Sequence, residues 1–183
     1  MFWKNKRVFI TGITGFKGSW LAYWLKKKGA KINGLGLKIE TYPNIYKELL
    51  KETNIDFNIS DISDYAKTFK LINNFKPHII IHMAAQPLVI TGYQEPYKTF
   101  NTNLIGTLNI LNIIKELKIC KMGIIITSDK VYKNNNLSSE VFYEKSELGG
   151  EDPYSASKSA SEIITNSYLK SYFNVDNKKL VSL

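Results

Sequence analysis

Residues 7–21 read Arg-Val-Phe-Ile-Thr-Gly-Ile-Thr-Gly-Phe-Lys-Gly-Ser-Trp-Leu, and this stretch decides the fold. The apolar run Arg7 to Thr11 predicts a buried strand, and a helical pattern begins soon after it. Between the two stand Gly12, Gly15 and Gly18, spaced G-x-x-G-x-x-G, with one residue more between the first two glycines than in the commoner dinucleotide fingerprint. Such glycines let the backbone approach a pyrophosphate, which the N–H groups of a helix N-terminus bind. We therefore expect a dinucleotide-binding turn; the alternative is a tight turn without a ligand.

The strand signal recurs along the chain. Runs rich in isoleucine and valine predict strands at residues 7–11, 31–37, 55–59, 78–82, 123–127 and 179–183. Three of these runs are nearly continuous in apolar residues, which indicates strands that helices cover on both faces. Alternating strand and helix patterns mean right-handed βαβ units. The sequence thus predicts an α/β fold with a doubly wound parallel sheet, a Rossmann fold, with helices on both faces.

Three segments between the strands show helical spacing, and we interpret their apolar side chains as core packing. These positions are Trp20, Leu21, Trp24 and Leu25 in the first segment, Leu104, Leu108, Leu111, Ile114 and Leu117 in the second, and Ala156, Ala160, Ile163 and Ile164 in the third. Gly29 is a plausible stop for the first helix and Pro153 a plausible start for the third. The irregular stretch from Lys133 to Asp152 predicts a long loop, and such loops are more often functional than idle.

Length, charge and cysteine content narrow the class of protein. At 183 residues and 44% hydrophobic, the chain suits one globular domain. The net charge of +9 comes from lysines spread along the chain without a nucleic-acid-binding motif, so we expect no nucleic-acid partner. The apolar runs are too short to span a membrane, and the N-terminus lacks the pattern of a secretion signal. The single cysteine, Cys120, excludes an internal disulfide and suits the cytoplasm. We interpret it as a buried or idle thiol.

The residues that follow the predicted strands are the other candidates for cofactor binding, because the carboxyl ends of parallel strands meet at one crevice. Asp61 either accepts a hydrogen bond from the adenine amino group or caps the next helix. Small side chains after the fourth strand would let the chain pass close to a ribose. His82 and His78 are interpreted as structural histidines. The full set of predicted cofactor-binding residues is Gly12, Thr14, Gly15, Phe16, Lys17, Gly18, Asp61, Ile62, Ala84, Ala85, Gln86, Thr102, Tyr154 and Lys158.

Tyr154 and Lys158 are the candidate catalytic pair. They stand four residues apart at the start of the third helix, and therefore on one face of it. A phenol needs a nearby cation to act as a base near neutral pH, and Lys158 can supply that charge. The lysine could also bind the ribose of a nicotinamide cofactor. Such a pair alone is a weak signal; its position well downstream of a glycine turn makes it specific.

A second group of polar residues, Ser128, Asp129 and Lys130, follows the fifth predicted strand. The carboxyl edge of the sheet would bring this hydroxyl, acid and amine to the same crevice. The alternative is an ordinary turn that carries a surface Asp129–Lys130 pair. We include all three as catalytic candidates and assign no metal ligand.

Taken in this order, the motifs resemble those of the extended short-chain dehydrogenase/reductase family. The resemblance extends over all 183 residues. It is strongest toward the nucleotide-sugar 4,6-dehydratases that act on CDP-glucose. The stretches that carry it are 2–4, 14–21, 82–89, 127–130 and 152–155. The discriminating piece is 127–130, in which Lys130 stands where the related dehydratases for dTDP-glucose carry glutamate.

The resemblance implies an enzyme with NAD as cofactor and a nucleotide sugar, CDP-glucose, as substrate. Tyr154 would take the proton of the sugar 4-hydroxyl while NAD accepts the C4 hydride, and Ser128 would bond the same oxygen. Asp129, with Lys130 as its partner, would assist the loss of water, and the hydride would then return to C6. The family also implies a homo-oligomer at full length. It continues for roughly another domain beyond Leu183, so residues 1–183 would be an NAD(P)-binding domain whose substrate domain is missing.

The chain departs from the family pattern at two positions. Two other functions are also compatible with the sequence. Lys38 stands where the family usually has an acidic residue for the adenosine ribose, which leaves NAD or NADP undecided. Ile90 replaces a usual arginine. A related sugar epimerase or reductase would share Tyr154 and Lys158 but would not need Asp129 and Lys130. A cofactor-binding fragment without turnover is the third reading.

Overall fold

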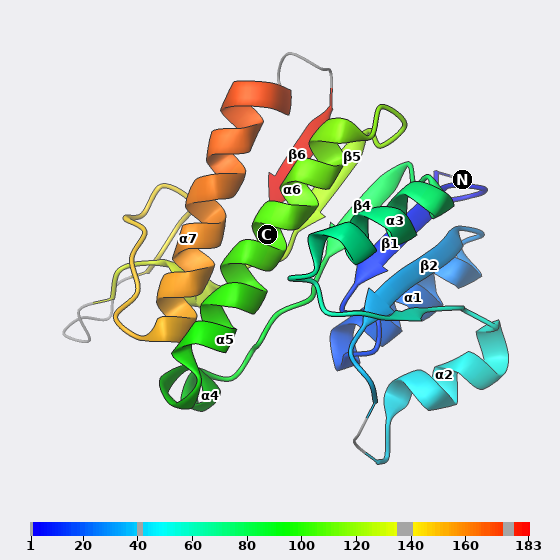
Figure 1. Ribbon diagram of the computed structural model, residues 1–183, viewed down its shortest axis with the longest axis horizontal. Coiled ribbons are helices and arrows are strands. Elements are labelled where there is room, and N and C mark those ends of the chain that lie inside the picture. Colours follow the sequence, from blue (N-terminus) through cyan, green and yellow to red (C-terminus); the bar gives the residue numbers. More distant parts are fainter. Residues whose placement is uncertain (1, 40–41, 135–140, 174–177) are drawn as a thin grey trace.

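The computed structural model of the chain describes residues 2–39, 42–134, 141–173 and 178–183, and within them it forms one parallel sheet between two layers of helices (Figure 1). The strand order is β3-β2-β1-β4-β5-β6, and every neighbouring pair is parallel. This is the doubly wound order with its switch point between β1 and β4. The strands are β1 (Arg7–Thr11), β2 (Lys31–Gly36), β3 (Asn58–Ile59), β4 (Ile79–His82), β5 (Met122–Ile125) and β6 (Lys179–Ser182). The predicted fold class is confirmed.

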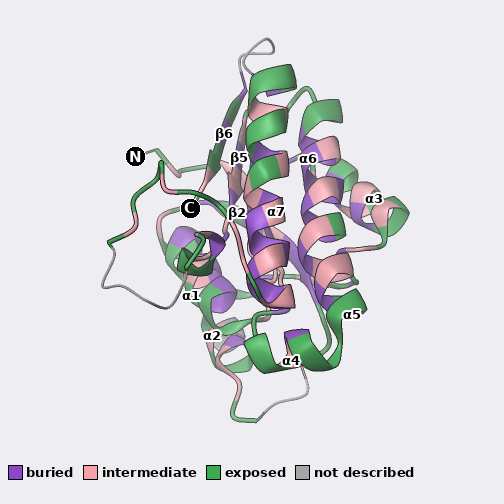
Figure 2. Ribbon diagram, turned by 90° about the vertical axis from the view of Figure 1, so that its left-hand side faces the viewer, coloured by how far each residue is buried: buried purple, intermediate pink, exposed green. Residues whose placement is uncertain are grey.

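The helices lie on both faces of the sheet, as expected for βαβ units (Figure 1). The longer ones are α1 (Phe16–Lys27), α2 (Ile45–Thr53), α3 (Tyr65–Phe75), α6 (Gly106–Glu116) and α7 (Pro153–Tyr168). The shorter ones are α4 (Val89–Gln94), α5 (Pro96–Phe100), the π-helical turns η1 (Asn101–Ile105) and η3 (Leu169–Phe173), and the 3₁₀ turn η2 (Asp129–Val131). Of the shorter ones, α4 and α5 are largely exposed (Figure 2). None of the described helices is long and apolar enough to cross a bilayer.

The core has two halves because side chains alternate across each strand. Phe9 and Ile80 point to the face covered by α3, α6 and η3. Val8, Ile10 and Ile81 point to the opposite face, which α1 and α2 cover. Continuous apolar strands are therefore needed, since both faces of the central strands are buried.

The apolar stripe predicted for α1 is only half correct. Leu25 is fully buried, but Trp20 and Trp24 are 46% and 50% exposed. The buried face instead consists mainly of small residues, Gly18, Ser19 and Ala22, with Leu25. Small side chains let α1 approach the sheet closely, which leaves the two tryptophans at its outer side. Core packing was therefore the wrong interpretation for Trp20 and Trp24.

The third predicted helix, α7, buries only part of the expected face, since Ile164 packs against the core while Ile163 does not. Ile163 is 57% exposed. The buried side chains are largely hydroxyl-bearing, and they bond helix carbonyls or neighbouring polar groups: Ser155, Ser157, Ser159, Ser161 and Thr165. The bond from the Ser159 hydroxyl to the Val131 carbonyl leaves the helix, so α7 is held to the domain by polar contacts together with the packing of Ile164 and Tyr168.

Several predicted boundaries differ from the observed ones. Ile55 is buried, yet only Asn58–Ile59 of the third predicted strand pair with β2. Strand β5 ends at Ile125, so Ile126 and Thr127 lie beyond its carboxyl end. Asp64, rather than Asp61, caps α3, with its carboxylate accepting from the Lys67 N–H at 3.0 Å. Of the predicted long loop 133–152, residues 135–140 lie outside the described part.

Candidate cofactor and active site

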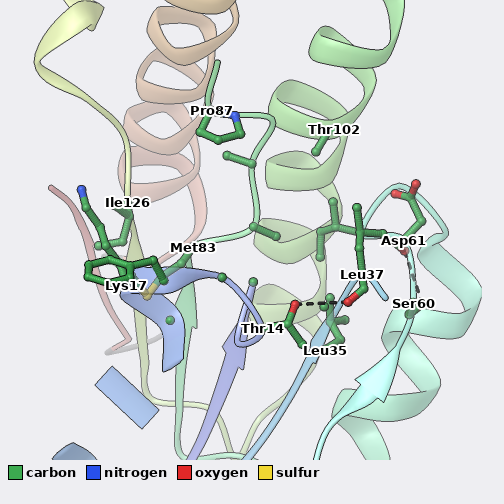
Figure 3. A pocket seen from close by; sticks show the side chains of 18 of the residues that line it. Thr14, Lys17, Leu35, Leu37, Ser60, Asp61, Met83, Pro87, Thr102 and Ile126 are labelled. Carbon is green, nitrogen blue, oxygen red and sulfur yellow. Dashed lines mark hydrogen bonds between the residues drawn. The ribbon is translucent and has the colours of Figure 1, made fainter. Parts of the chain in front are cut away.

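A cavity of about 480 Å³ lies at the carboxyl ends of the strands, on both sides of the switch point between β1 and β4 (Figure 3). It contains every predicted cofactor-binding residue except Gln86. The lining residues that sequence reasoning missed are Leu35, Gly36, Leu37, Ser60, Met83, Pro87, Lys98, Ile126 and Thr127. Most of them directly end or follow a predicted strand, so the rule that ligands bind beyond the carboxyl ends could have found them.

The glycine turn has no room for side chains at two of its three glycines. Gly12 has a φ of +71°, and a Cβ there would lie 2.8 Å from the Ala84 nitrogen. A Cβ at Gly18 would overlap the Gly12 carbonyl. These glycines therefore serve close packing of β1, β4 and α1 around the cavity floor. Gly15 is more open, since its Cβ would lie 3.3 Å from the Gly12 oxygen.

The N-terminus of α1 opens into the same cavity. Gly15 is the N-cap residue and provides no side-chain hydrogen bond. The first N–H groups of a helix have no partner within it, so those of Phe16, Lys17 and Gly18 are available to an anion. All three residues line the cavity. This is the arrangement that a pyrophosphate requires.

One end of the cavity is formed by the ends of β2 and β3. Leu35, Gly36 and Leu37 come from β2 and its exit, and Ser60 and Asp61 follow β3. The Asp61 carboxylate accepts from the Ser63 N–H at 2.9 Å and from the Ser63 hydroxyl at 2.8 Å, which fixes its position at the rim. Its place suits the adenine-binding alternative, and the helix-cap alternative is wrong.

At the other end, the cap of α7 positions Tyr154. The Asp152 carboxylate accepts from the N–H groups of Tyr154 at 2.9 Å and Ser155 at 3.1 Å, and from the Ser155 hydroxyl. Burial alone would raise the pKa of Asp152, but these hydrogen bonds hold it below its usual value. The ionised cap starts α7 at Pro153, so that Tyr154 and Lys158 both face the cavity.

Lys158 is a buried cation. It is 6% exposed, and its Nζ donates to the Ile126 carbonyl at 3.2 Å. Burial lowers the pKa of Lys158 to about 8, with Glu162 opposing the shift and Lys17 adding to it. Glu162 itself accepts from the Thr127 hydroxyl at 2.5 Å, which ties α7 to the chain just beyond β5.

His82 is a structural histidine, as predicted. It is buried, and its two ring nitrogens lie 2.7 Å from the Thr11 hydroxyl and 3.1 Å from the Thr107 hydroxyl. Burial, aided by the Lys158 charge, lowers its pKa to about 3. The ring is therefore neutral and already bonded at both nitrogens.

Ser128, Asp129 and Lys130 lie outside the cavity lining. Lys130 Nζ contacts the Asp129 carboxylate at 3.2 Å, with side chains 60% and 81% exposed. The hydrogen bond from Lys130 lowers the pKa of Asp129, against a smaller opposing effect of burial. The Ser128 hydroxyl accepts from the Lys130 N–H and donates to Asp129, so it caps η2. This geometry is the surface pair that sequence analysis gave as the alternative.

Gln86 is not part of the cavity wall. Its side chain bonds the Leu88 backbone and the Thr99 hydroxyl, and its own backbone bonds Asn103. These contacts secure the segment from β4 to α4. Gln86 therefore supports the loop that carries Ala84 and Ala85, which do line the cavity.

The residues present fit a dinucleotide. The turn at Gly12 and Gly18 would be blocked by any side chain, the uncapped helix start faces the cavity, and a buried lysine and a tyrosine stand at its far end. The adenine would lie near Asp61, the pyrophosphate at α1, and the nicotinamide near Tyr154 and Lys158.

Comparison of the sequence with known proteins identifies related enzymes. The profile of the GDP-mannose 4,6 dehydratase family matches residues 9–175. A CDP-glucose 4,6-dehydratase from Salmonella typhimurium is 42% identical to this chain over 176 residues, which are 96% of this chain and 49% of the relative. The chain thus spans about half the length of that relative.

Solved structures share the fold. The UDP-Glc/GlcNAc 4-epimerase from Campylobacter jejuni superimposes with a TM-score of 0.84, over 97% of this chain and 52% of that one. The UDP-glucose 4-epimerase from Brucella ovis, solved in complex with NAD, gives 0.80 over 97% of this chain and 50% of that one. Both are 22% identical in sequence, so they show the fold alone.

Proposed function

The chain belongs to the GDP-mannose 4,6 dehydratase family of extended short-chain dehydrogenase/reductase enzymes, and on that premise we propose that it is the cofactor-binding half of a nucleotide-sugar 4,6-dehydratase acting on CDP-glucose. The observation that carries the proposal is a single cavity that joins the glycine turn to Tyr154 and Lys158. The 42% identity to a CDP-glucose 4,6-dehydratase supports the choice of substrate.

We propose NAD as the cofactor, since the residues of the turn and of α1 suit its pyrophosphate. When bound, NAD would accept a hydride from C4 of the sugar and return it to C6. Lys158 would hold the nicotinamide ribose, and its contact with the Ile126 carbonyl fixes its position for that task.

Tyr154 is the proposed base for the sugar 4-hydroxyl. Its start-of-helix position is fixed by Asp152, and Lys158 lies one helical turn away and lines the same cavity. The Ser128 hydroxyl would bond the same sugar oxygen. Oxidation at C4 would acidify the C5 proton, so that water can be eliminated across C5 and C6.

Asp129 is the proposed acid for the departing 6-hydroxyl, with Lys130 as its partner. In the exposed pair, the Lys130 hydrogen bond lowers the pKa of Asp129, so the carboxylate is ionised at neutral pH. Burial under a bound sugar would raise its pKa, because desolvation disfavours the charged form. The acid role therefore depends on substrate covering this pair.

We also propose a cytoplasmic, homo-oligomeric full-length enzyme with a nucleotide sugar as its small-molecule partner and no nucleic-acid or membrane partner. The buried Cys120 is compatible with a reducing compartment. In this proposal residues 1–183 form the cofactor domain, and contacts to the nucleotide sugar come from a further domain, as the half-length match to the relative suggests.

Mass spectrometry of the sugar product tests the function. The protein from the complete reading frame is incubated with NAD and CDP-glucose, with dTDP-glucose and UDP-glucose in parallel. We expect a product lighter than CDP-glucose by one water. A product of unchanged mass with inverted C4 would instead establish an epimerase. Residues 1–183 alone are expected to bind NAD weakly and give no product; multiple turnovers would refute the need for a further domain.

A further inference from the structure

Glu162 is a carboxylate on α7 that the proposed mechanism does not use. It follows Lys158 by four residues, so the two side chains leave the same face of the helix one turn apart. Both reach the chain just beyond the carboxyl end of β5. The Lys158 ammonium donates to the Ile126 carbonyl at 3.2 Å, and the Thr127 hydroxyl donates to Glu162 Oε1 at 2.5 Å. The helix therefore holds two successive residues of this segment at once.

Thr127 is well placed to be the partner of Glu162. It is buried, and its N–H donates to the Leu183 carbonyl at 2.6 Å, just beyond the ladder between β5 and β6. Its single hydroxyl proton has two acceptors, Glu162 at 2.5 Å and the Leu183 carbonyl at 3.2 Å, and the carboxylate is the closer and the stronger one. Because Ile126 and Thr127 are adjacent in the chain, the bond to Glu162 also fixes the carbonyl that binds Lys158.

The charged and titratable groups around Lys158 come from three elements. They are Tyr154 and Glu162 on α7, Lys17 on α1, and the buried, neutral His82 on β4. Burial lowers the pKa of Lys158, Lys17 adds to this effect, and Glu162 opposes it. Among the described residues, Glu162 is therefore the acid that favours the charged form of Lys158.

The other described carboxylates near the cavity have partners elsewhere. Asp61 lies at the opposite end of the cavity and accepts from Ser63. Asp129 is exposed, contacts Lys130 and does not line the cavity. Asp152 caps the start of α7. Of these described acids and Glu162, only Glu162 is placed to balance the buried ammonium group.

We propose that Glu162 is a positioning residue for Lys158: through Thr127 it fixes the segment that binds the ammonium group, and it supplies the opposite charge for this buried cation. The proposal rests on the proposed role of Lys158 at the nicotinamide ribose. Glu162 does not line the cavity, so it acts through Lys158 and not on the cofactor itself.

Two substitutions separate the hydrogen bond from the charge. Glu162→Gln keeps an oxygen that can accept from the Thr127 hydroxyl and removes the charge, whereas Glu162→Ala removes both. Glu151→Gln makes the same change of charge at an exposed carboxylate just before α7 and is the matched control. Circular dichroism verifies that each variant folds. If Glu162→Ala does not fold, Glu162→Gln and its control still decide on the charge.

Calorimetric titration of the chain with NAD between pH 6 and pH 10 is the first measurement, and it needs no turnover. For the wild type we expect the affinity to fall as the pH rises through the pKa of Lys158, about 8, because an ammonium group bonds a ribose more strongly than an amine. In Glu162→Gln this midpoint should lie lower by at least about half a pH unit, since the charge that favours the ammonium form is gone. Glu151→Gln should keep the wild-type midpoint.

The hydrogen bond to Thr127 is tested at pH 6, where Lys158 is protonated. There Glu162→Gln should bind NAD within about threefold of the wild type, because its amide oxygen replaces the carboxylate as acceptor. Glu162→Ala should bind at least about tenfold more weakly, because the Thr127 hydroxyl has lost this partner.

Urea denaturation is the second measurement, and it needs no cofactor. The drop in urea midpoint caused by Glu162→Gln is compared in the wild type and in a Lys158→Met background, at pH 7 and pH 9.5. At pH 7 we expect the larger drop in the wild type, where the substitution removes an attraction between opposite charges. At pH 9.5 the two drops should agree, since Lys158 of the folded chain has lost its proton.

The proposed charge effect is wrong if the NAD-binding midpoint of Glu162→Gln stays at the wild-type pH, or if the urea drops agree in the two backgrounds at pH 7. Equal NAD affinities of Glu162→Gln and Glu162→Ala at pH 6 would overturn the role of the Thr127 bond. A wild type that binds no NAD at any pH would overturn the proposed function, and the urea comparison would still decide whether Glu162 balances Lys158.

Discussion

The buried charge of Lys158 is expected to lower the free energy of unfolding of the chain, although the proposed function requires this lysine. Its ammonium group is almost fully buried, with one hydrogen bond to the Ile126 carbonyl. Replacing it by methionine removes the charge and keeps a side chain of similar length. We predict that Lys158→Met is more stable relative to the wild type at pH 7 than at pH 9.5, and that it binds NAD more weakly.

The magnitude follows from the pKa of the buried lysine. Burial lowers that pKa from 10.5 to about 8. Below pH 8 the folded and unfolded chains both carry the proton, and the fold bears the full cost, about 3 kcal/mol at 1.36 kcal/mol per pK unit. Between pH 8 and 10.5 the folded state loses its proton first, so stability rises with pH. The cost falls to about 1 kcal/mol at pH 9.5 and vanishes above 10.5.

Urea denaturation of wild type and variant at the two pH values is the assay. The free energy of unfolding of the variant minus that of the wild type should be about 2 kcal/mol greater at pH 7 than at pH 9.5. The lost hydrogen bond to Ile126 affects both values alike, so it cancels in this comparison. Lys118→Met, at an exposed lysine, is the control and should show no such dependence. An equal difference at both pH values would refute a buried, charged Lys158.

Four further predictions concern single residues. In the complete enzyme, Tyr154→Phe should leave NAD affinity unchanged in calorimetry and slow turnover by at least about a hundredfold, since only the base is lost; a mild kinetic effect would count against it. Gly18→Ala should abolish NAD binding and lower the thermal midpoint, because its Cβ would overlap the Gly12 carbonyl; unchanged affinity would mean that the turn is not the pyrophosphate site. Asp129→Asn in the complete enzyme should accumulate reduced cofactor, seen by absorbance, because an amide cannot protonate the leaving group; normal product without reduced cofactor would exclude the acid role. Burial raises the pKa of Cys120 to about 11, so its thiol should react with a disulfide reagent only after denaturation; rapid reaction of the native chain would contradict its burial.

The sequence predicted the glycine turn well because its signal is local. A strand, a turn and a helix start follow one another within residues 7–21, and each is signalled by its own residue types: apolar residues for the strand, glycines for the turn and helical spacing after it. The predicted 55–59 strand shows the limit of such patterns. Ile55 is buried as its type suggests, yet the ladder with β2 includes only Asn58–Ile59. An apolar pattern reports burial, and hydrogen bonding to a neighbour is a separate, long-range property.

The sequence patterns could not predict which face of each helix is buried. Trp20 and Trp24 have the spacing of a core stripe, but the small residues Gly18 and Ala22 make the closest approach to the sheet. Which of two adjacent helix faces is buried depends on the shape of the partner surface. The bond between Thr127 and Glu162 has the same origin, since it joins two residues that are neighbours only in the folded chain.

A buried chain of hydrogen bonds explains how the glycine turn and α7 keep a fixed distance. The Thr107 hydroxyl donates to the Asn103 carbonyl at 2.6 Å, so it must accept from His82 Nε2, and the other ring nitrogen then accepts from Thr11. Asn103 in turn donates to the Ser157 hydroxyl of α7 at 2.8 Å. Loss of any one member would leave a buried polar partner unsatisfied, at a cost of about 1–3 kcal/mol. The polar face of α7 therefore serves a purpose that an apolar stripe could not, because directional bonds set the place of the helix relative to β1, at whose end the glycine turn begins.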